Sequence, residues 1–244
     1  MSNRITSPVP GLVLGLSLLL VLIAAAVLAP PATAAGKVQA NLRVVTWQGK
    51  ILFDGKARTG TARIKPNTAC LGGEPGPART VSGPTALGLI AAASKKSAAL
   101  RPLKISDGEY GFGICGFGNT VAKDPQWWVL RTNYRDASAG AELVTVKKND
   151  NILLYLSKSY MDDTPDSLFL KAPAKVKKGK FARVRVFKYT GAGKRSPVKG
   201  AKVPGAKPTN AKGFTRVKIR KRTRIAARQP GLIPSNRVVI GIRR

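Results

Sequence analysis

The sequence predicts an α+β domain followed by an all-β sandwich, both behind an N-terminal export leader. Mixed strand patterns surround a single helix pattern in the first part of the chain. Short strand patterns separated by turn signals fill the last part. An apolar run with one preceding charge stands at the N-terminus. The predicted organisation is a signal peptide (1–35), an α+β domain (36–157), a linker (158–167) and a basic sandwich (168–244).

The first 35 residues have the pattern of a secretory leader. Arg4 precedes an apolar run at residues 11–29, which two prolines end, and small residues follow up to Ala34. This pattern predicts export and cleavage after Ala34. The alternative is an uncleaved anchor, because 19 apolar residues nearly suffice to span a bilayer. The sequence therefore predicts a secreted or envelope-associated protein, which would contact the membrane only if the leader stayed uncleaved.

The α+β domain is predicted from strand, turn and helix signals taken in order. Turn signals at residues 48–50 and at Asp54-Gly55 separate the first strands, and Thr85 caps the helix, which ends near Leu100. A long loop is expected at 66–84, and a glycine–aromatic strand or bent loop at 110–118. The strands are expected at Leu42–Trp47, Ile51–Phe53, Lys56–Ile64, Trp127–Leu130, Leu143–Val146 and Ile152–Leu156, with turns at 133–136 and 147–151.

The sandwich is predicted from six short apolar-alternating segments with Gly, Pro and Lys-rich turns between them. They are LFLKAP (168–173), FARVRVFKY (181–189), VKGAKV (198–203), GFTRVKIR (213–220), RIAAR (224–228) and NRVVIGI (236–242).

Cys70 and Cys115 are the only cysteines of the chain. An even number in an exported protein predicts one disulfide, which would tie the long loop to the glycine–aromatic segment. The alternative, two free thiols, suits an oxidising exterior poorly.

The charge is divided unevenly along the chain. The formal net charge is +32, and residues 171–244 contribute 24 Lys and Arg without a single acid, whereas residues 35–170 carry 18 against 11 acids. Such a balance favours polyanionic partners, although a basic face that is merely solvated is the alternative. In the densest run, Val217 and Ile219 are expected to point inward. The candidate polyanion-binding residues are Lys218, Arg220, Lys221, Arg222 and Arg224.

Aromatic side chains suggest a second candidate surface, in the first domain. Trp127 and Trp128 are adjacent and would face opposite ways in a strand, so one is expected in the core and the other exposed. Exposed aromatics can stack on sugars, bases or planar ligands, and the alternative is a pair that packs both faces of a sheet. The candidate aromatic surface comprises Tyr110, Phe112, Phe117, Trp127, Trp128 and Tyr134.

Catalysis and metal binding are not expected. The chain has no histidine, which excludes nucleophiles activated by a Ser–His or Cys–His pair. Two carboxylate pairs could place acids within reach for glycoside chemistry, but acidic residues are also common in turns that have no catalytic role. They are Asp107 with Glu109 and Asp136 with Glu142.

The linker acids Asp162, Asp163 and Asp166 lack the glycine turn and final Glu of a calcium loop, so a solvated linker is predicted, with a cation site as the alternative. The prediction is no enzyme, no cofactor and no metal.

Several motifs of the first domain resemble the transcobalamin-like C-terminal domain family of exported bacterial proteins. They are PTALGLI (84–90), YGFGICGFG (110–118), Trp127-Trp128 followed by Asn133, and residues 140–156. The resemblance implies a helix packed on a β-grasp sheet. It also implies a cap over a planar ligand, because the eukaryotic relatives use this fold to cap cobalamin. Two positions differ: Tyr134 stands where the family has Gly, and Asn149-Asp150 where it has Gly-Asp.

The second domain is similar to the immunoglobulin-like modules of bacterial surface proteins. The similarity lies in PVKGAKV (197–203), TNAKGFT (209–215) and IPSNRVV (233–239). Asn210 replaces the usual Asp of the second segment, so no calcium role follows.

Together these features predict an exported envelope protein held to anionic wall polymers by its basic domain. Export argues against intracellular nucleic acid as the partner. The alternative function is binding of a cobalamin-like planar small molecule, with the first domain as a cap.

Overall fold

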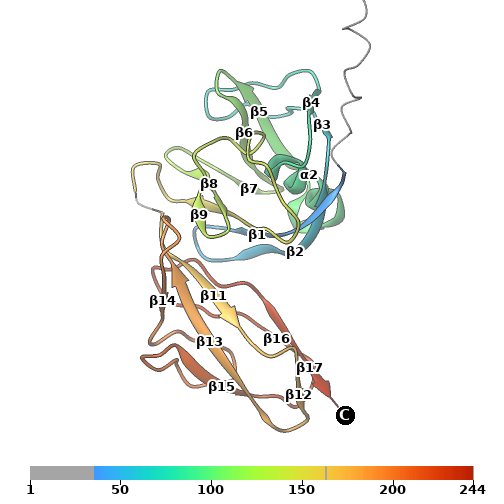
Figure 1. Ribbon diagram of the computed structural model, residues 1–244. Helices are drawn as coiled ribbons and strands as arrows, with labels where there is room; N and C mark the ends of the chain where they lie inside the picture. Colours follow the sequence, from blue (N-terminus) through green and yellow to red (C-terminus); the bar gives the residue numbers. More distant parts are fainter. Residues whose placement is uncertain (1–35, 163, 244) are drawn as a thin grey trace, which may run out of the picture. The chain divides into compact units, whose positions relative to one another are not determined.

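A computed structural model describes residues 36–162 and 164–243 (Figure 1). The predicted leader lies outside the described residues. The described chain consists mostly of strands with a single α-helix, which confirms a β-rich α+β class. Residues 35–244 form one compact unit that contains two large hydrophobic clusters and a small third one. The exact boundary between two domains stays a prediction.

The first part of the unit, which comprises the elements from β1 to β10, is built on a five-stranded sheet. Its order is β2-β1-β10-β8-β9, in which β1 and β10 run parallel and the other neighbours antiparallel. The strands are β1 (Val38–Val45), β2 (Ile51–Thr59), β8 (Trp127–Thr132), β9 (Arg135–Asp136) and β10 (Asn151–Ser157).

Both faces of this sheet are covered, as alternation along its central strands makes clear. Leu154 of β10 belongs to the first cluster, whereas its neighbours Leu153 and Tyr155 belong to the third. On β1, Val44 and Val45 are divided in the same way. Successive side chains of a strand point to opposite faces, so a continuous apolar run such as NILLYL is typical of a strand that is buried on both sides.

One sequence prediction for β2 is wrong. Asp54-Gly55 was expected to be a turn, but the strand runs through both residues. The ring of Phe53 lies over Gly55, where a Cβ would approach Phe53 Cζ to 3.3 Å. Gly55 therefore makes room for an aromatic side chain rather than for a turn.

The predicted helix is confirmed as α2 (Ala86–Lys96), followed by a short 3-10 turn η1 (Ala98–Leu100). Thr85 Oγ1 accepts the Gly88 N–H at 3.1 Å, as an N-cap should. Leu87, Leu89, Ile90 and Ala93 are fully buried and pack in the first cluster with β1 and β2. The helix thus covers one face of the five-stranded sheet (Figure 1).

The strand expected at Leu143–Val146 is not formed. The carbonyls of Ala141 and Val144 instead accept the N–H groups of Leu87 and Ala86, both at 2.9 Å. The first N–H groups of a helix have no partner within the helix. This segment therefore caps α2, and the exposed Leu143 has no strand partner.

A small antiparallel sheet holds the glycine–aromatic segment. It consists of β5 (Leu103–Gly108), β6 (Gly111–Phe117) and β7 (Thr120–Val121). A Cβ at Gly116 would lie 2.2 Å from the Thr120 carbonyl oxygen, so the close backbone approach predicted for these glycines is confirmed there. The long loop is interrupted by a strand, β4 (Arg79–Val81), which pairs with β3 (Ala62–Ile64).

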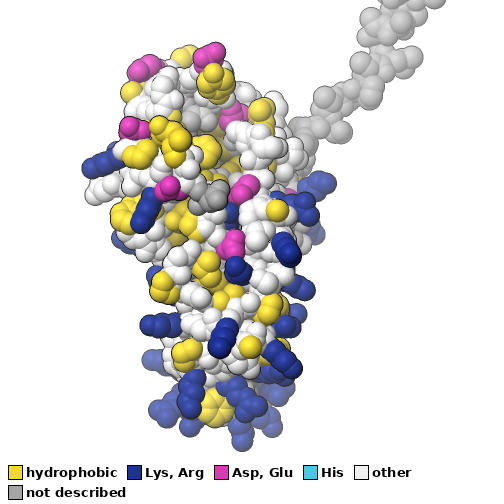
Figure 2. Space-filling view, turned by 90° about the vertical axis from the view of Figure 1, so that its left-hand side faces the viewer, with side chains coloured by type: hydrophobic (Ala, Val, Ile, Leu, Met, Phe, Trp, Pro, Cys, Tyr) yellow, Lys and Arg dark blue, Asp and Glu magenta, His cyan; other side chains and the backbone are white. Residues whose placement is uncertain are grey.

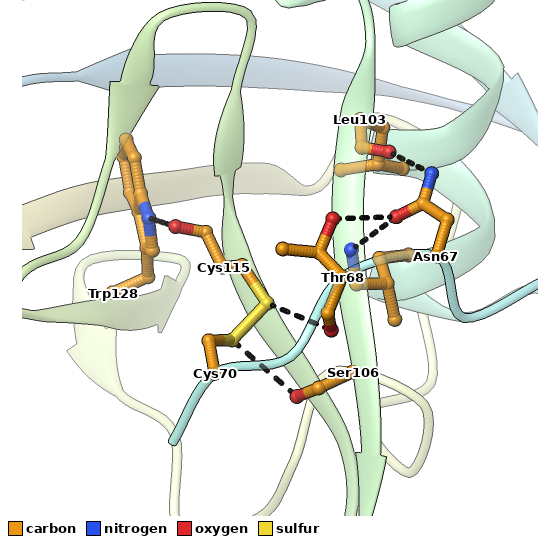
Figure 3. Close-up of a disulfide and its surroundings, with 8 residues drawn as sticks. Asn67, Thr68, Cys70, Leu103, Ser106, Cys115 and Trp128 are labelled. Carbon is orange, nitrogen blue, oxygen red and sulfur yellow. Dashed lines mark hydrogen bonds between the residues drawn. A yellow bond between two sulfur atoms is a disulfide. The ribbon is translucent and has the colours of Figure 1, made fainter. Parts of the chain in front are cut away.

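The predicted disulfide joins Cys70 to Cys115, with their Cα atoms 5.7 Å apart (Figure 3). Cys115 is fully buried on β6, and the Trp128 indole Nε1 donates to its carbonyl at 3.3 Å. The Ser106 hydroxyl lies 3.4 Å from Cys70 Sγ. The bond ties the loop to the core and indicates an oxidising environment.

The second part of the unit, which comprises the strands from β11 to β17, is a pair of sheets around the second cluster. One sheet contains β11, β13, β14 and β15, and the other contains β12, β16 and β17, with β12 parallel to β17. The strands are β11 (Ser167–Lys171), β12 (Lys175–Lys177), β13 (Phe181–Tyr189), β14 (Arg195–Pro197), β15 (Phe214–Lys218), β16 (Thr223–Ile225) and β17 (Val238–Arg243).

Five of the six predicted strand segments overlap these strands, and VKGAKV does not. Its backbone forms one isolated antiparallel bridge, Lys202 with Arg228, instead of a continuous strand ladder, and a side chain binds the preceding turn. Thr209 Oγ1 donates to the Val198 carbonyl at 2.6 Å and accepts the Ala201 N–H at 2.9 Å. Gly200 between them has φ +82°, a conformation that glycine adopts readily.

The two parts are joined through buried arginines rather than only through a solvated linker. Arg43 is 6% exposed and donates to the carbonyls of Leu168 at 3.2 Å and Pro234 at 2.7 Å. Arg131 is 1% exposed and donates to the Pro165 carbonyl at 2.9 Å and to the Asp136 carboxylate at 2.5 Å. Burial lowers the pKa of Arg43. Because these guanidinium groups are satisfied by the linker and the second part, the junction is a specific packed contact.

An acid at the same junction gives stability a testable pH dependence. The Arg237 N–H donates to the Asp54 carboxylate, yet burial raises the pKa of Asp54 above its ordinary value of 3.8. A raised folded-state pKa means that the folded protein favours the neutral carboxyl. The associated stability is present at low pH and is lost as the pH rises through the folded pKa.

Asp54→Asn keeps an acceptor for Arg237 but cannot ionise. We expect the free energy of unfolding of this variant, relative to the wild type, to increase as the pH rises from about 3 to about 7. Urea unfolding at a series of pH values measures this difference. A difference that is constant, or that falls with pH, would contradict the assignment.

Candidate functional site

The cations of the second part are almost all exposed and unpaired. Of the described Lys and Arg side chains after residue 170, only Arg185 and Lys188 are partly buried. Among the described residues, the one ion pair they make joins Lys188 to Asp166 at 2.8 Å. In Figure 2 dark-blue side chains are densest at the lower end of the view, and the magenta acids lie in its upper and middle parts. The uneven charge of the sequence is therefore a surface property of one region.

The five candidate polyanion-binding residues are all exposed. Val217 and Ile219 are buried while Lys218 and Arg220 point outward, so the predicted alternation is confirmed. The five do not lie on one strand, however. Lys218 ends β15 in one sheet, Arg224 lies on β16 in the other, and the remaining three form the connection between them. They follow an edge between the two sheets.

A second group of cations lies on the outer face of the β11-β13-β14-β15 sheet, and of these the sequence reasoning singled out only Lys218. On β13 the small and branched residues Ala182, Val184 and Val186 are buried, so the intervening residues face out. We name the outward side chains the basic–aromatic face: Lys171, Arg183, Arg185, Arg195, Arg216 and Lys218, with Phe181, Phe187 and Phe214.

Like charges stand directly opposite each other on the basic–aromatic face. Lys171 pairs with Arg185 between β11 and β13, and Arg183 pairs with Arg216 between β13 and β15. Such cross-strand pairs destabilise a sheet unless something neutralises them. The pairs recur two residues apart along β13, a backbone repeat of roughly 7 Å. The face therefore presents a regular array of positive charge that an anionic chain would stabilise.

Aromatic rings hold the guanidinium groups in place. Arg183 lies over the Phe214 ring with Cζ 3.8 Å from the centroid, and Arg185 lies 4.5 Å from the Phe187 centroid. Arg195 contacts the same Phe187 ring at 4.9 Å. A cation over a ring face is attracted by the ring quadrupole. Because the ring already restricts the guanidinium group, less side-chain entropy is lost when that group binds an anion. The alternating pattern F-x-R-x-R-x-F at 181–187 is the sequence signal that would have placed Arg183, Arg185 and Phe187 on one face of a strand.

The predicted aromatic surface of the first part is not assembled. Phe112, Phe117 and Trp128 are core side chains with exposures of 9% or less, and Phe117 packs edge-on against Trp128 at 5.1 Å between centroids. The prediction of one buried and one exposed tryptophan is confirmed, because Trp127 is 42% exposed. Tyr110, at 92%, is also exposed. The other aromatics form core contacts because β6 and β8 pack on each other.

Tyr134 lies at the junction instead of on a ligand surface. It stacks on Tyr189 with centroids 4.0 Å apart and meets Phe169 edge-on at 5.6 Å. Burial raises the pKa of Tyr134 to about 12. Asn133 and Tyr134 both have positive φ and form the predicted turn between β8 and β9. The turn thus places the Tyr134 ring in contact with two aromatic side chains of the second part, Phe169 and Tyr189.

Three of the four carboxylates in the two candidate pairs make structural contacts, and the fourth, Glu109, is exposed. Asp107 binds Arg79 at 2.5 Å and Asp136 binds Arg131 at 2.5 Å. Glu142 accepts the Phe112 N–H at 3.0 Å, away from Asp136. Among the described residues, no group of three acids or cysteines is arranged to hold a metal ion. Asp163 lies outside the described residues.

A shallow groove of about 370 Å³ remains in the first part. Leu71, Phe112, Trp127, Trp128 and Leu130 contribute to its lining. Three of the six candidate aromatics therefore border one groove, of which Trp127 is the exposed wall.

Within residues 36–162 and 164–243, no helix has the length and apolar character needed to cross a bilayer. Comparison with protein families, with curated proteins and with solved structures gave no match for this chain.

Proposed function

We propose that this protein is an exported component of a bacterial envelope and that its second part binds anionic wall polymers. The observation that carries the proposal is the pair of like-charge cross-strand contacts on the basic–aromatic face, Lys171 with Arg185 and Arg183 with Arg216. The leader pattern supports export, and the disulfide supports an oxidising environment. No enzymatic activity and no cofactor are part of the proposal.

The proposed mechanism is electrostatic. Phosphate or carboxylate groups of the polymer would replace small counterions at the exposed cations, and the released counterions would drive binding. Arginines that are ordered by Phe187 and Phe214 can meet an oxyanion with two parallel N–H bonds. The edge from Lys218 to Arg224 would extend the contact from one sheet to the other.

The fold resemblances enter the proposal as inferences. A parallel pair β1/β10 in the centre, antiparallel β2 and β8 outside it, and α2 on one face support a β-grasp domain. Two packed sheets with β12 parallel to β17 support an immunoglobulin-like domain.

Cosedimentation with purified bacterial cell walls tests the function. We expect the protein to pellet with walls at low salt and to be released as salt is raised. Neutral substitutions from Lys218 to Arg224 should lower the bound fraction. Soluble DNA as a competitor distinguishes a wall-polymer preference from general polyanion binding. Absence of any binding at low salt would overturn the proposal.

A second candidate function is binding of a cobalamin-like planar ligand, and the groove bordered by Phe112, Trp127 and Trp128 favours it. Its volume of about 370 Å³ is at the low end for small-molecule sites, so it would cover only one face of such a ligand. Saturable quenching of tryptophan fluorescence by a corrinoid would support this candidate, and unsaturable quenching would exclude it.

A further inference from the structure

A cleft of about 540 Å³ lies at the junction of the two parts, away from the basic–aromatic face. Its walls come from the turn between β1 and β2, the end of β10, and the loop between β16 and β17. Arg228 Nη1 donates to the Gly49 carbonyl at 2.9 Å and so fixes two of these walls against each other. The volume lies within the range of small-molecule sites.

One wall of the cleft is aromatic. Trp47 is 37% exposed, and Tyr155 lines the same space. The Lys158 ammonium lies 5.2 Å from the centroid of the Trp47 ring. An exposed indole beside a cleft provides a flat surface on which the apolar face of a sugar ring can stack.

The rim of the cleft is positively charged. Lys158, Lys202 and Arg228 line it and are exposed, against the single carboxylate of Asp162. None of the four makes an ion pair within the part of the chain that the structure describes. This balance favours a ligand with at least one anionic group.

We propose that this cleft binds a saccharide unit that carries a carboxylate or a phosphate. Such a unit combines the two properties that the walls select: an apolar ring face for Trp47 and an anion for Lys158 and Lys202. The site would add specific recognition of one or two sugar units, and it does not depend on the proposed polymer binding by the basic–aromatic face.

Calorimetric titration with glucuronic acid, glucose 6-phosphate and glucose tests the proposal. We expect at least one acidic sugar to bind saturably and about tenfold more tightly than glucose, because hydrogen bonds to charged groups are the stronger ones. The preferred acidic sugar identifies carboxylate or phosphate as the anion. Trp47→Phe should retain binding but lose the fluorescence change that accompanies it in the wild type.

Two double variants of equal charge locate the site. Lys158→Ala with Lys202→Ala should weaken the acidic sugars about tenfold. Lys175→Ala with Lys199→Ala, two exposed cations outside the cleft, should leave affinity unchanged. Equal affinities in the two double variants, or acidic sugars that bind no better than glucose, would overturn the proposal while leaving wall cosedimentation unaffected.

Discussion

Replacement of Lys171, Arg183, Arg185 and Arg216 by Gln is expected to lower affinity for cell walls at low salt roughly a thousandfold. A Lys or Arg at an anionic surface contributes about 1 kcal/mol, and these four form the two like-charge cross-strand pairs. The free energy of unfolding should fall little, since relief of the repulsion offsets the lost contacts with Phe187 and Phe214.

A matched control variant distinguishes the contribution of the basic–aromatic face from the effect of lowering the total charge. Lys175, Lys177, Lys178 and Lys199 are exposed and lie outside the basic–aromatic face, and their replacement by Gln removes the same four charges. Cosedimentation at one salt concentration should show a much smaller loss for this variant. If both variants lose binding equally, attraction depends only on net charge, and the cross-strand pairs have no special role.

Removal of the disulfide is expected to cost about 4 kcal/mol of the free energy of unfolding. The bond closes a loop with a sequence separation of 45 residues, and cross-linking a loop of this length restricts the unfolded chain by that amount. Cys70→Ala with Cys115→Ala removes both thiols, and alanine fits the buried position of Cys115 without a polar atom.

Denaturant unfolding of the double variant and of the wild type measures this cost. The wild type in reductant is a control, which should approach the variant. Alkylation followed by mass measurement should label both cysteines only after reduction. A loss of less than about 1 kcal/mol would contradict this account, because the cross-link would then restrict the unfolded chain far less than its loop length implies.

Local signals in the sequence predicted the elements whose structure depends on local chemistry. Thr85 marks the helix start because its side chain caps the first turn. The disulfide followed from cysteine number, and FARVRVFKY from strict alternation. The failures depend on distant contacts. Gly55 lies in a strand because the Phe53 ring covers it, and residues 141–144 cap a helix that precedes them by about fifty residues.

For the candidate sites too, local sequence predicted some features, and the features it missed depend on contacts between distant residues. Exposure of Lys218 and Arg220 followed from their alternation with Val217 and Ile219. The pairing of Arg183 with Arg216 depends on register between strands distant in sequence, which a single sequence does not specify. Burial of Phe117 and Trp128 likewise results from contact between two strands. The buried arginines of the junction could not be distinguished from surface cations before their carbonyl partners were known.

The most direct test of the central claim is the salt dependence of binding to a soluble phosphate-repeat polymer. Each phosphate contact contributes about −0.7 to the slope of log affinity against log salt for a flexible single chain. The four cations of the two cross-strand pairs therefore predict a contribution of about −3 to the slope, and this contribution should be lost in the four-fold Gln variant. A slope near zero, or an equal slope in the variant, would contradict polyanion binding by this face.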